Sequence, residues 1–179
     1  MPNFETHILA VADGSWDRFE QDWRNQCQKG DSEFDEYAPT SLRLFKGVVD
    51  GTGASLGPLN TSVIAALWDN DTEHYYLAAL LNRAGLPGWD GRVLRVREMT
   101  VSPLIDCDMA AVAMYPDVII GTLNGVFHLA GTSLGADHIH MNLRSPADKA
   151  FFAAFGTAFG ASGVATKVET KGSWLYVTL

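Results

Sequence analysis

Two histidines beside a carboxylate, at Asp137, His138 and His140, have the residue types and spacing that most readily suggest chemistry. The run 137–143 reads as a strand, so His138 and His140 fall on one face of it. Two imidazoles and an adjacent carboxylate resemble part of a metal site but do not complete a ligand set, so we expect no metal. One imidazole could act as a base or as a hydrogen-bonding group. The plainer alternative is a half-buried strand histidine.

Other common catalytic and cofactor motifs are absent from the sequence. The glycines of the loop 50–60 lack the spacing of a dinucleotide-binding turn, and there is no G-x-S-x-G motif. Cys27 and Cys107 lie in no zinc-binding or nucleophile signature. With 13 Lys and Arg against 21 Asp and Glu, the net charge is −8, which argues against nucleic-acid binding. Neither a signal peptide nor a membrane-spanning segment is recognisable, so we expect a cytoplasmic protein without membrane association.

Hydrophobic periodicity and turn signals predict the elements that position these residues. The spacing of Trp16, Phe19 and Trp23 predicts a helix that ends before Gly30, with its aromatic stripe in the core. The acidic and aromatic segment 31–40 is expected to be a short helix or a loop. Strands are predicted at 6–12, 42–49, 61–68, 73–81, 92–101, 137–143, 165–170 and 173–179, with an irregular segment at 104–115. Two further helices are predicted, one from Pro116 to Gly135 and one beginning at Ser145.

This order of elements predicts the fold class. A chain of 179 residues, 47% hydrophobic and 19% charged, is typical of one globular domain, here spanning residues 1–179. The three successive strands between residues 61 and 101 are joined by short connections and form an antiparallel meander. We therefore expect an α/β (α+β) domain with a mixed, mostly antiparallel sheet flanked by helices.

Three local features, together with this order, resemble the GNAT superfamily of acyl-CoA-dependent N-acyltransferases. The run from Glu98 to Pro103, EMTVSP, is similar to the L-x-V-x-P strand that precedes the family's cofactor helix. The strand from His138, followed by the helix from Ser145, is similar to the family's next strand and helix. The closing strand carries Trp174-Leu175-Tyr176, as in many members.

The resemblance implies where a thioester donor would bind. In the family the central strand and its neighbour splay apart, which the resemblance places beyond Met99–Val101, and the acyl-pantetheine arm pairs with the unpaired backbone there. The cofactor-binding residues would be Met99, Thr100 and Val101. The pyrophosphate would meet the start of the following helix, near Val118, Ile119 and Gly121. The co-substrate would be acyl-CoA or acyl-ACP.

The sequence departs from the family's R-x-x-G-x-G/A turn and from its usual catalytic acid. With Gly121 as the last small residue, Pro116 replaces the arginine and Ile119 replaces the middle glycine. Phe152 stands where many members place a tyrosine. Gly121 and Gly125 either let their helix lie close to the sheet or leave room for a ligand.

The candidate catalytic residues are Glu98, Tyr115, His138 and His140, the titratable groups best placed around the strands and the helix start that the resemblance singles out. Glu98 would act as a general base that takes a proton from an amine, with His138 or His140 as an alternative base, and Tyr115 would protonate the departing thiolate. Glu98 could instead pair with a basic side chain across the strand edge.

Three functional hypotheses remain open at this point. The first is an acyltransferase that moves an acyl group from a thioester carrier to a small-molecule amine. The second is a catalytically silent GNAT-like module that binds a small ligand. The third is an unrelated α+β protein with the same order of elements. The expected partners are a small-molecule amine or thioester, with a homodimer as an open alternative.

Overall fold

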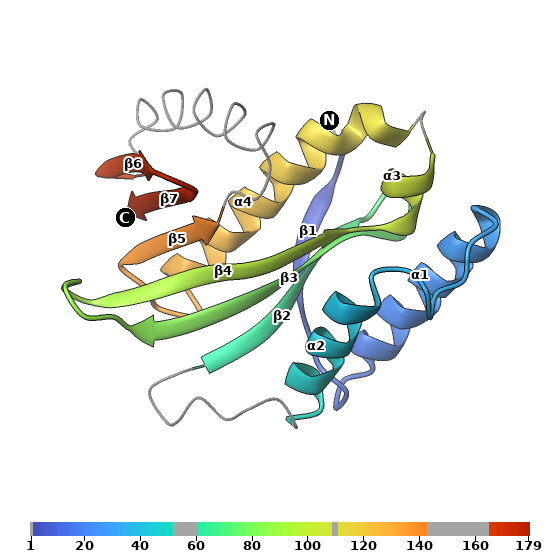
Figure 1. Cartoon of the computed structure of the whole chain (residues 1–179), viewed down its shortest axis with the longest axis horizontal. Helices are drawn as coiled ribbons and strands as arrows, with labels where there is room; N and C mark the ends of the chain where they lie inside the picture. Colours follow the sequence, from blue (N-terminus) through green and yellow to red (C-terminus); the bar gives the residue numbers. More distant parts are fainter. Residues whose placement is uncertain (1, 52–60, 109–110, 143–164) are drawn as a thin grey trace. The chain divides into compact units, whose positions relative to one another are not determined.

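The computed structural model describes residues 2–51, 61–108, 111–142 and 165–179 (Figure 1). In chain order its elements are β1 (Phe4–Leu9), α1 (Ser15–Lys29), α2 (Pro39–Val49), β2 (Thr61–Asp69), β3 (His74–Gly85), β4 (Arg92–Val101), α3 (Pro103–Cys107), the 3-10 helix η1 (Ala111–Met114), α4 (Tyr115–Gly131), β5 (His138–Asn142), β6 (Lys167–Lys171) and β7 (Trp174–Thr178).

Seven strands form one mixed sheet in the order β1-β2-β3-β4-β5-β7-β6. The β4–β5 pair is parallel, whereas β1–β2, β5–β7 and β6–β7 are antiparallel. The predicted class, an α/β domain with a mostly antiparallel sheet and flanking helices, is therefore confirmed. The chain divides into two compact units: unit 1 comprises 1–56, 62–81 and 98–126, and unit 2 comprises 57–61, 82–97 and 127–179.

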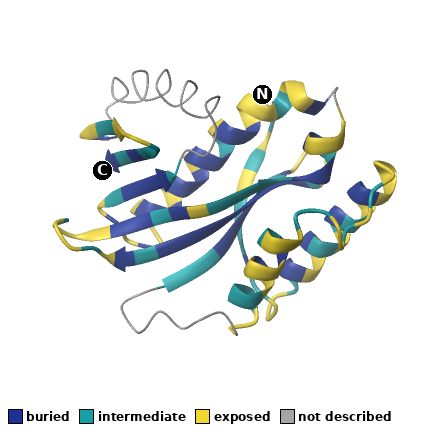
Figure 2. Cartoon of the chain, viewed as in Figure 1, coloured by how far each residue is buried: buried dark blue, intermediate teal, exposed yellow. Residues whose placement is uncertain are grey.

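The core of unit 1 is aromatic and lies beneath α1 and α2. Trp16, Phe19 and Trp23 are almost fully buried, as their spacing predicted. The rings of Phe19 and Trp23 have centroids 4.5 Å apart, and Phe19 meets Tyr75 of β3 edge-on. Figure 2 shows the resulting division of α1 and α2 into a buried side and an exposed side. This amphipathic packing fixes both helices on the sheet of unit 1.

The prediction of a strand at 42–49 is wrong, because these residues form helix α2. Pro39 occupies the first turn, where a missing N–H costs nothing, and Leu42 and Phe45 are buried one helical turn apart. The β-branched residues Val48 and Val49 end the helix, and both pack against the core. The burial of one helical face therefore outweighs the low helix propensity of the two valines.

The segment after β4 is also more regular than predicted. Ser102 caps the short helix α3 by accepting a hydrogen bond from the N–H of Ile105, and Pro103 is the first helical residue. The 3-10 helix η1 then leads directly into α4. The predicted helix from Ser145, and with it Phe152, lies outside the described residues.

Several strands and turns agree closely with the prediction. Strand β4 has the predicted bounds, and β2 and β3 meet at the predicted turn after Asp69. The closing hairpin turns at Gly172, whose φ of 61° only glycine adopts without strain. The sequence marks these elements strongly, because their turns contain glycine, Asp or Asn and their strands are apolar runs.

Gly121 and Gly125 bring α4 close to β1 and β2 within unit 1. A Cβ at Gly121 would lie 2.6 Å from Cδ2 of Phe4 and 3.3 Å from Leu67. A Cβ at Gly125 would collide with the Thr6 side chain. Both glycines therefore serve the close approach of helix and sheet, which was one of the two roles that their spacing left open.

The substitution Gly125→Ala tests this packing. We expect it to lower the free energy of unfolding by about 1–3 kcal/mol, because the clash outweighs the gain in helix propensity. Gly131→Ala is the matched control, since a Cβ at Gly131 meets nothing within 4 Å. Urea unfolding of both variants measures the difference. Equal stability of the two would contradict the close approach.

Candidate functional site

Glu98 lies half-buried on β4 and is held by helix α2. The hydroxyl of Ser41 donates a hydrogen bond to Oε1 of Glu98 over 3.1 Å. A serine hydroxyl that donates to a carboxylate fixes its orientation. Both interpretations of Glu98, as a base or as one half of an ion pair, stay predictions.

The carbonyl of Val101 points away from β3, toward the opposite edge of β4. The N–H of Ser102 donates to the carbonyl of Tyr76 in β3 over 2.9 Å. Since the C=O of Val101 and the N–H of Ser102 belong to one trans peptide group, they point in opposite directions. The phenol of Tyr37 donates to this carbonyl over 2.8 Å. Tyr37 thus occupies a backbone acceptor at the end of the strand.

The parallel ladder between β4 and β5 joins Val93–Val96 to His138–Met141. Among the described residues its last pair is Val96 with Met141, whereas β4 continues to Val101. Within the described residues the ladder thus reaches Val96, and the splay that the resemblance implies beyond Met99–Val101 stays a prediction. Met99, Thr100 and Val101 are half-buried, in contrast to the fully buried Val93 and Leu94.

The start of α4 offers few free backbone N–H groups to a phosphate. The helical stretch begins at Ala111, whose N–H binds the carbonyl of Asp108, and it runs through η1 into α4. The amides of Val118 and Ile119 therefore have helical carbonyls one turn behind them. The Val118 side chain is fully buried and that of Ile119 nearly so. The binding of a phosphate at these two residues and at Gly121 stays a prediction that this geometry does not favour.

Tyr115, the predicted acid, is the first residue of α4. Its side chain is exposed, with 37% of its surface accessible. An exposed phenol can exchange protons with solvent and can reach a substrate, so its position fits the predicted role without testing it.

His138 has both ring nitrogens engaged within unit 2. Nε2 lies 2.7 Å from the carbonyl of Asp90 and must donate to it, so the neutral ring accepts at Nδ1 from the hydroxyl of Thr178, 3.1 Å away. The imidazole thereby ties the β3–β4 turn to β7. No nitrogen is left over for base catalysis in this arrangement.

His140 is buried among aromatic rings of the same unit. Only 4% of its surface is exposed, and its ring meets Trp89 with centroids 4.3 Å apart and Tyr176 with centroids 4.7 Å apart. Burial, with a smaller effect of His138 and Arg95, lowers the pKa of His140 from 6.5 to about 4. The ring is therefore neutral at pH 7 and a weak base.

The predicted catalytic residues thus fall into two local environments. In unit 1, Glu98 is grouped with Ser41, Tyr37 and the end of β4, and in unit 2 the two histidines are grouped with Trp89. Sequence reasoning missed Tyr37, Ser41 and Trp89. A helical assignment of residues 39–49 would have placed Ser41 in a first turn, but no local signal pairs Tyr37 with Val101.

Two grooves lie beside α1 and α2 in unit 1. One, of about 510 Å³, is lined by Arg24, Glu33, Phe34 and neighbouring residues, and the other, of about 360 Å³, by Trp16, Asp35, Lys46 and neighbouring residues. None of the predicted site residues lines either groove. In the described part of the chain, no three His, Cys, Asp or Glu side chains gather to hold a metal ion. Nor does any helix there have the length and apolarity needed to cross a membrane.

Comparison with solved structures identifies the fold. An N-acetyltransferase from Staphylococcus aureus Mu50 superposes with a TM-score of 0.54 at 11% identity, covering 98% of this chain and 97% of that one. FdhC, a nucleotide-linked sugar GNAT, gives 0.46 at 9% identity, covering 99% and 86%. The toxin AtaT, solved with the C-terminus of antitoxin AtaR and acetyl-CoA, gives 0.45 at 10%, covering 97% and 92%. No protein-family model and no curated protein matches the sequence. The chain has the GNAT fold, as a divergent example of it.

Burial of neutral His140 makes stability depend on pH. Because its pKa is about 4 in the folded state and 6.5 in the reference state, the unfolded chain binds the proton more tightly. The stabilisation is complete above pH 6.5 and is lost as the pH falls toward 4. Between pH 7 and pH 5 we expect this one group to remove about 2 kcal/mol from the free energy of unfolding.

Urea unfolding at both pH values, on the wild type and His140→Phe, measures this loss. The variant should lose about 2 kcal/mol less than the wild type, whereas His128→Gln, which alters an exposed ring on α4, should behave like the wild type. An NMR titration of the His140 ring gives the same answer without a substitution. If the ring titrates near 6.5, the prediction is wrong.

Proposed function

We propose that this protein transfers an acyl group from a thioester donor, acyl-CoA or acyl-ACP, to a small-molecule amine, as a single GNAT-like domain of residues 1–179. The observation that carries the proposal is the half-buried carboxylate of Glu98 on β4, held by Ser41 beside the strand end Met99–Val101. The GNAT fold supports an acyltransferase type of chemistry.

In the proposed reaction the amine attacks the thioester carbonyl. A C–N bond forms and the C–S bond breaks, while the nitrogen loses a proton and the thiolate gains one. Glu98 takes the proton from the amine, directly or through a water. Tyr115 supplies the proton to the thiolate and regains one from solvent. His138 and His140 are the weaker candidates for the base, because one is fully hydrogen-bonded and the other is neutral and buried.

The donor arm is proposed to lie extended beside Met99, Thr100 and Val101. Backbone groups at the free edge of a strand can pair with the amides of such an arm. The carbonyl of Val101 faces this edge but is held by Tyr37 in the present arrangement. The arm must therefore either displace the Tyr37 hydroxyl from this carbonyl or form its hydrogen bonds with the other backbone groups of Met99–Val101.

Substitution of the base tests the chemistry. A panel of acyl-CoA and acyl-ACP donors is first screened by thermal shift, where a donor at one hundred times its dissociation constant stabilises by about 2.7 kcal/mol. With an active donor and amine, Glu98→Gln should lower kcat by roughly 10²-fold or more. Glu36→Gln, which alters an exposed carboxylate, is the control. Full activity of Glu98→Gln would exclude Glu98 as the base.

Removal of the Tyr37 hydroxyl tests the position of the donor arm. Tyr37→Phe keeps the ring against Trp23 and frees the carbonyl of Val101. A hydrogen bond contributes about 0.5–1.5 kcal/mol, so donor affinity should rise roughly 2- to 10-fold, as measured by calorimetry. An unchanged or weaker affinity would place the arm elsewhere.

A catalytically silent binding module is the second candidate. The observation that favours it is the continuous helix from Ala111 through α4, together with the packed Gly121, which leaves little room for a phosphate at the start of α4. Ligands that stabilise the protein without turnover on any amine would support this candidate over the enzyme.

A further inference from the structure

One row of side chains crosses three strands of unit 2. Arg95 of β4 is paired with His140 of β5, and His140 is paired with Tyr176 of β7. Paired residues of neighbouring strands project to the same face of a sheet. A guanidinium, an imidazole and a phenol therefore stand side by side.

These three groups have unused hydrogen-bonding capacity. Nε2 of His140 is buried without a hydrogen-bond partner. Among the described residues, no carboxylate pairs with the half-buried Arg95, whose recorded contact is with the Trp174 ring, 5.8 Å from the centroid. Within the described part of the chain, the contacts of Tyr176 are those of its ring with Trp89, His140 and Lys171. A buried polar atom and a half-buried cation without partners are both costly, so a ligand that completes them would bind favourably.

The charges around this row favour an anion. Burial lowers the pKa of the Arg95 guanidinium, and the neighbouring Arg97 lowers it further. Glu169, the acidic residue opposite Tyr176 on β6, is already engaged by Lys167 at 2.7 Å and Lys171 at 3.0 Å. In a chain of net charge −8, this row is therefore locally cationic.

Aromatic rings frame the row and define the shape of the ligand. The ring of Trp89 lies parallel to that of Tyr176, with an interplanar angle of 8° and centroids 5.6 Å apart. Trp174 lies beneath the guanidinium of Arg95. Stacked rings next to a cation suit a flat, apolar body that carries a negative charge.

We propose that unit 2 holds a binding site for a small aromatic carboxylate, formed by Arg95, His140 and Tyr176 and stacked against Trp89. The carboxylate pairs with the guanidinium of Arg95 and the phenol of Tyr176. A shift of the Trp89 ring, which covers His140, lets Nε2 donate to the second oxygen. The site uses neither Glu98, Tyr115 nor the strand end Met99–Val101, and it shares with the proposed acyl transfer only His140, the buried and weaker candidate for the base.

Benzoate is the probe for this site, and benzyl alcohol is the uncharged control. NMR titration follows the Trp89 indole and the His140 ring as each compound is added to the full chain. We expect saturable shifts of both residues with benzoate and binding at least 10-fold weaker with benzyl alcohol. No saturation by benzoate up to about 50 mM, or equal binding of the two compounds, would overturn the proposal.

Two variants and a matched control locate the site. Arg95→Gln should weaken benzoate binding at least 10-fold, whereas Arg95→Lys, which keeps the charge, should weaken it less. Arg92→Gln removes an exposed cation on the other face of β4 and should change the affinity less than 2-fold. If Arg95→Gln does not fold, the affinities of Arg95→Lys and Arg92→Gln are compared instead, and only Arg95→Lys should bind benzoate more weakly than the wild type. Equal effects of the Arg95 and Arg92 substitutions would show a non-specific attraction and overturn the site.

Discussion

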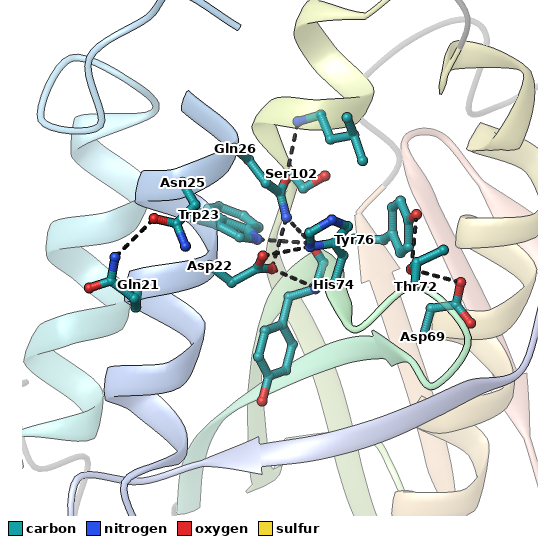
Figure 3. A network of polar contacts seen from close by, with 12 residues as sticks. Gln21, Asp22, Trp23, Asn25, Gln26, Asp69, Thr72, His74, Tyr76 and Ser102 are labelled. Carbon is teal, nitrogen blue, oxygen red and sulfur yellow. Dashed lines mark hydrogen bonds and ion pairs between the residues drawn. The ribbon is translucent and has the colours of Figure 1, made fainter. Parts of the chain in front are cut away.

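The peptide groups of Tyr75, at the start of β3, are the constraint on which unit 1 depends. Side chains of α1 satisfy both of them, and Figure 3 shows Asp22, Trp23 and Gln26 gathered beside His74 at the start of β3. Asp22 accepts from the N–H of Tyr75 over 2.7 Å, and the carbonyl accepts from Nε1 of Trp23 and Nε2 of Gln26. Buried backbone groups must be paired, so α1 can occupy only one position along β3. His74 and Gln26 also bind Asp22, which offsets the cost of burying its carboxylate.

This network extends to the end of β4 through Gln26. Its Oε1 accepts from the N–H of Leu104, which sets the first turn of α3. Ser102 caps that helix and donates to Tyr76, the residue after Tyr75. The carbonyl of Val101 is turned away from β3 as a consequence, and Tyr37 reaches it from the segment before α2. The candidate site of unit 1 is thus positioned by side chains of α1 that take no part in the proposed chemistry.

Much of the fold could be predicted from local signals, and the failures have identifiable causes. The stripe of Trp16, Phe19 and Trp23 and the turn after Asp69 are local patterns, and both were predicted. Helix α2 was missed because the burial of Leu42 and Phe45 on one of its faces is a tertiary interaction, which the local sequence does not show. In the site, Glu98 was selected by its place on a recognisable strand. Ser41 and Glu98 are 57 positions apart, and Tyr37 and Val101 are 64 positions apart. Contacts between residues so distant in the sequence leave no pattern in its local spacing.

The glycines of α4 show how one residue type can serve two opposed functions. In a phosphate cradle the missing Cβ leaves room for a ligand and the free N–H groups bind it. Here the side chains of Phe4 and Thr6 occupy the space that a Cβ at Gly121 or Gly125 would need. The 3-10 helix η1 precedes α4 directly, so its carbonyls lie one turn behind the first amides of α4. The Ile119 side chain is also buried in the protein, so an isoleucine fits at the position that corresponds to a glycine in the family's motif. If the proposed acyl transfer holds, the donor depends more on the strand edge at Met99–Val101 than on its phosphates, and carriers recognised through the pantetheine arm are favoured.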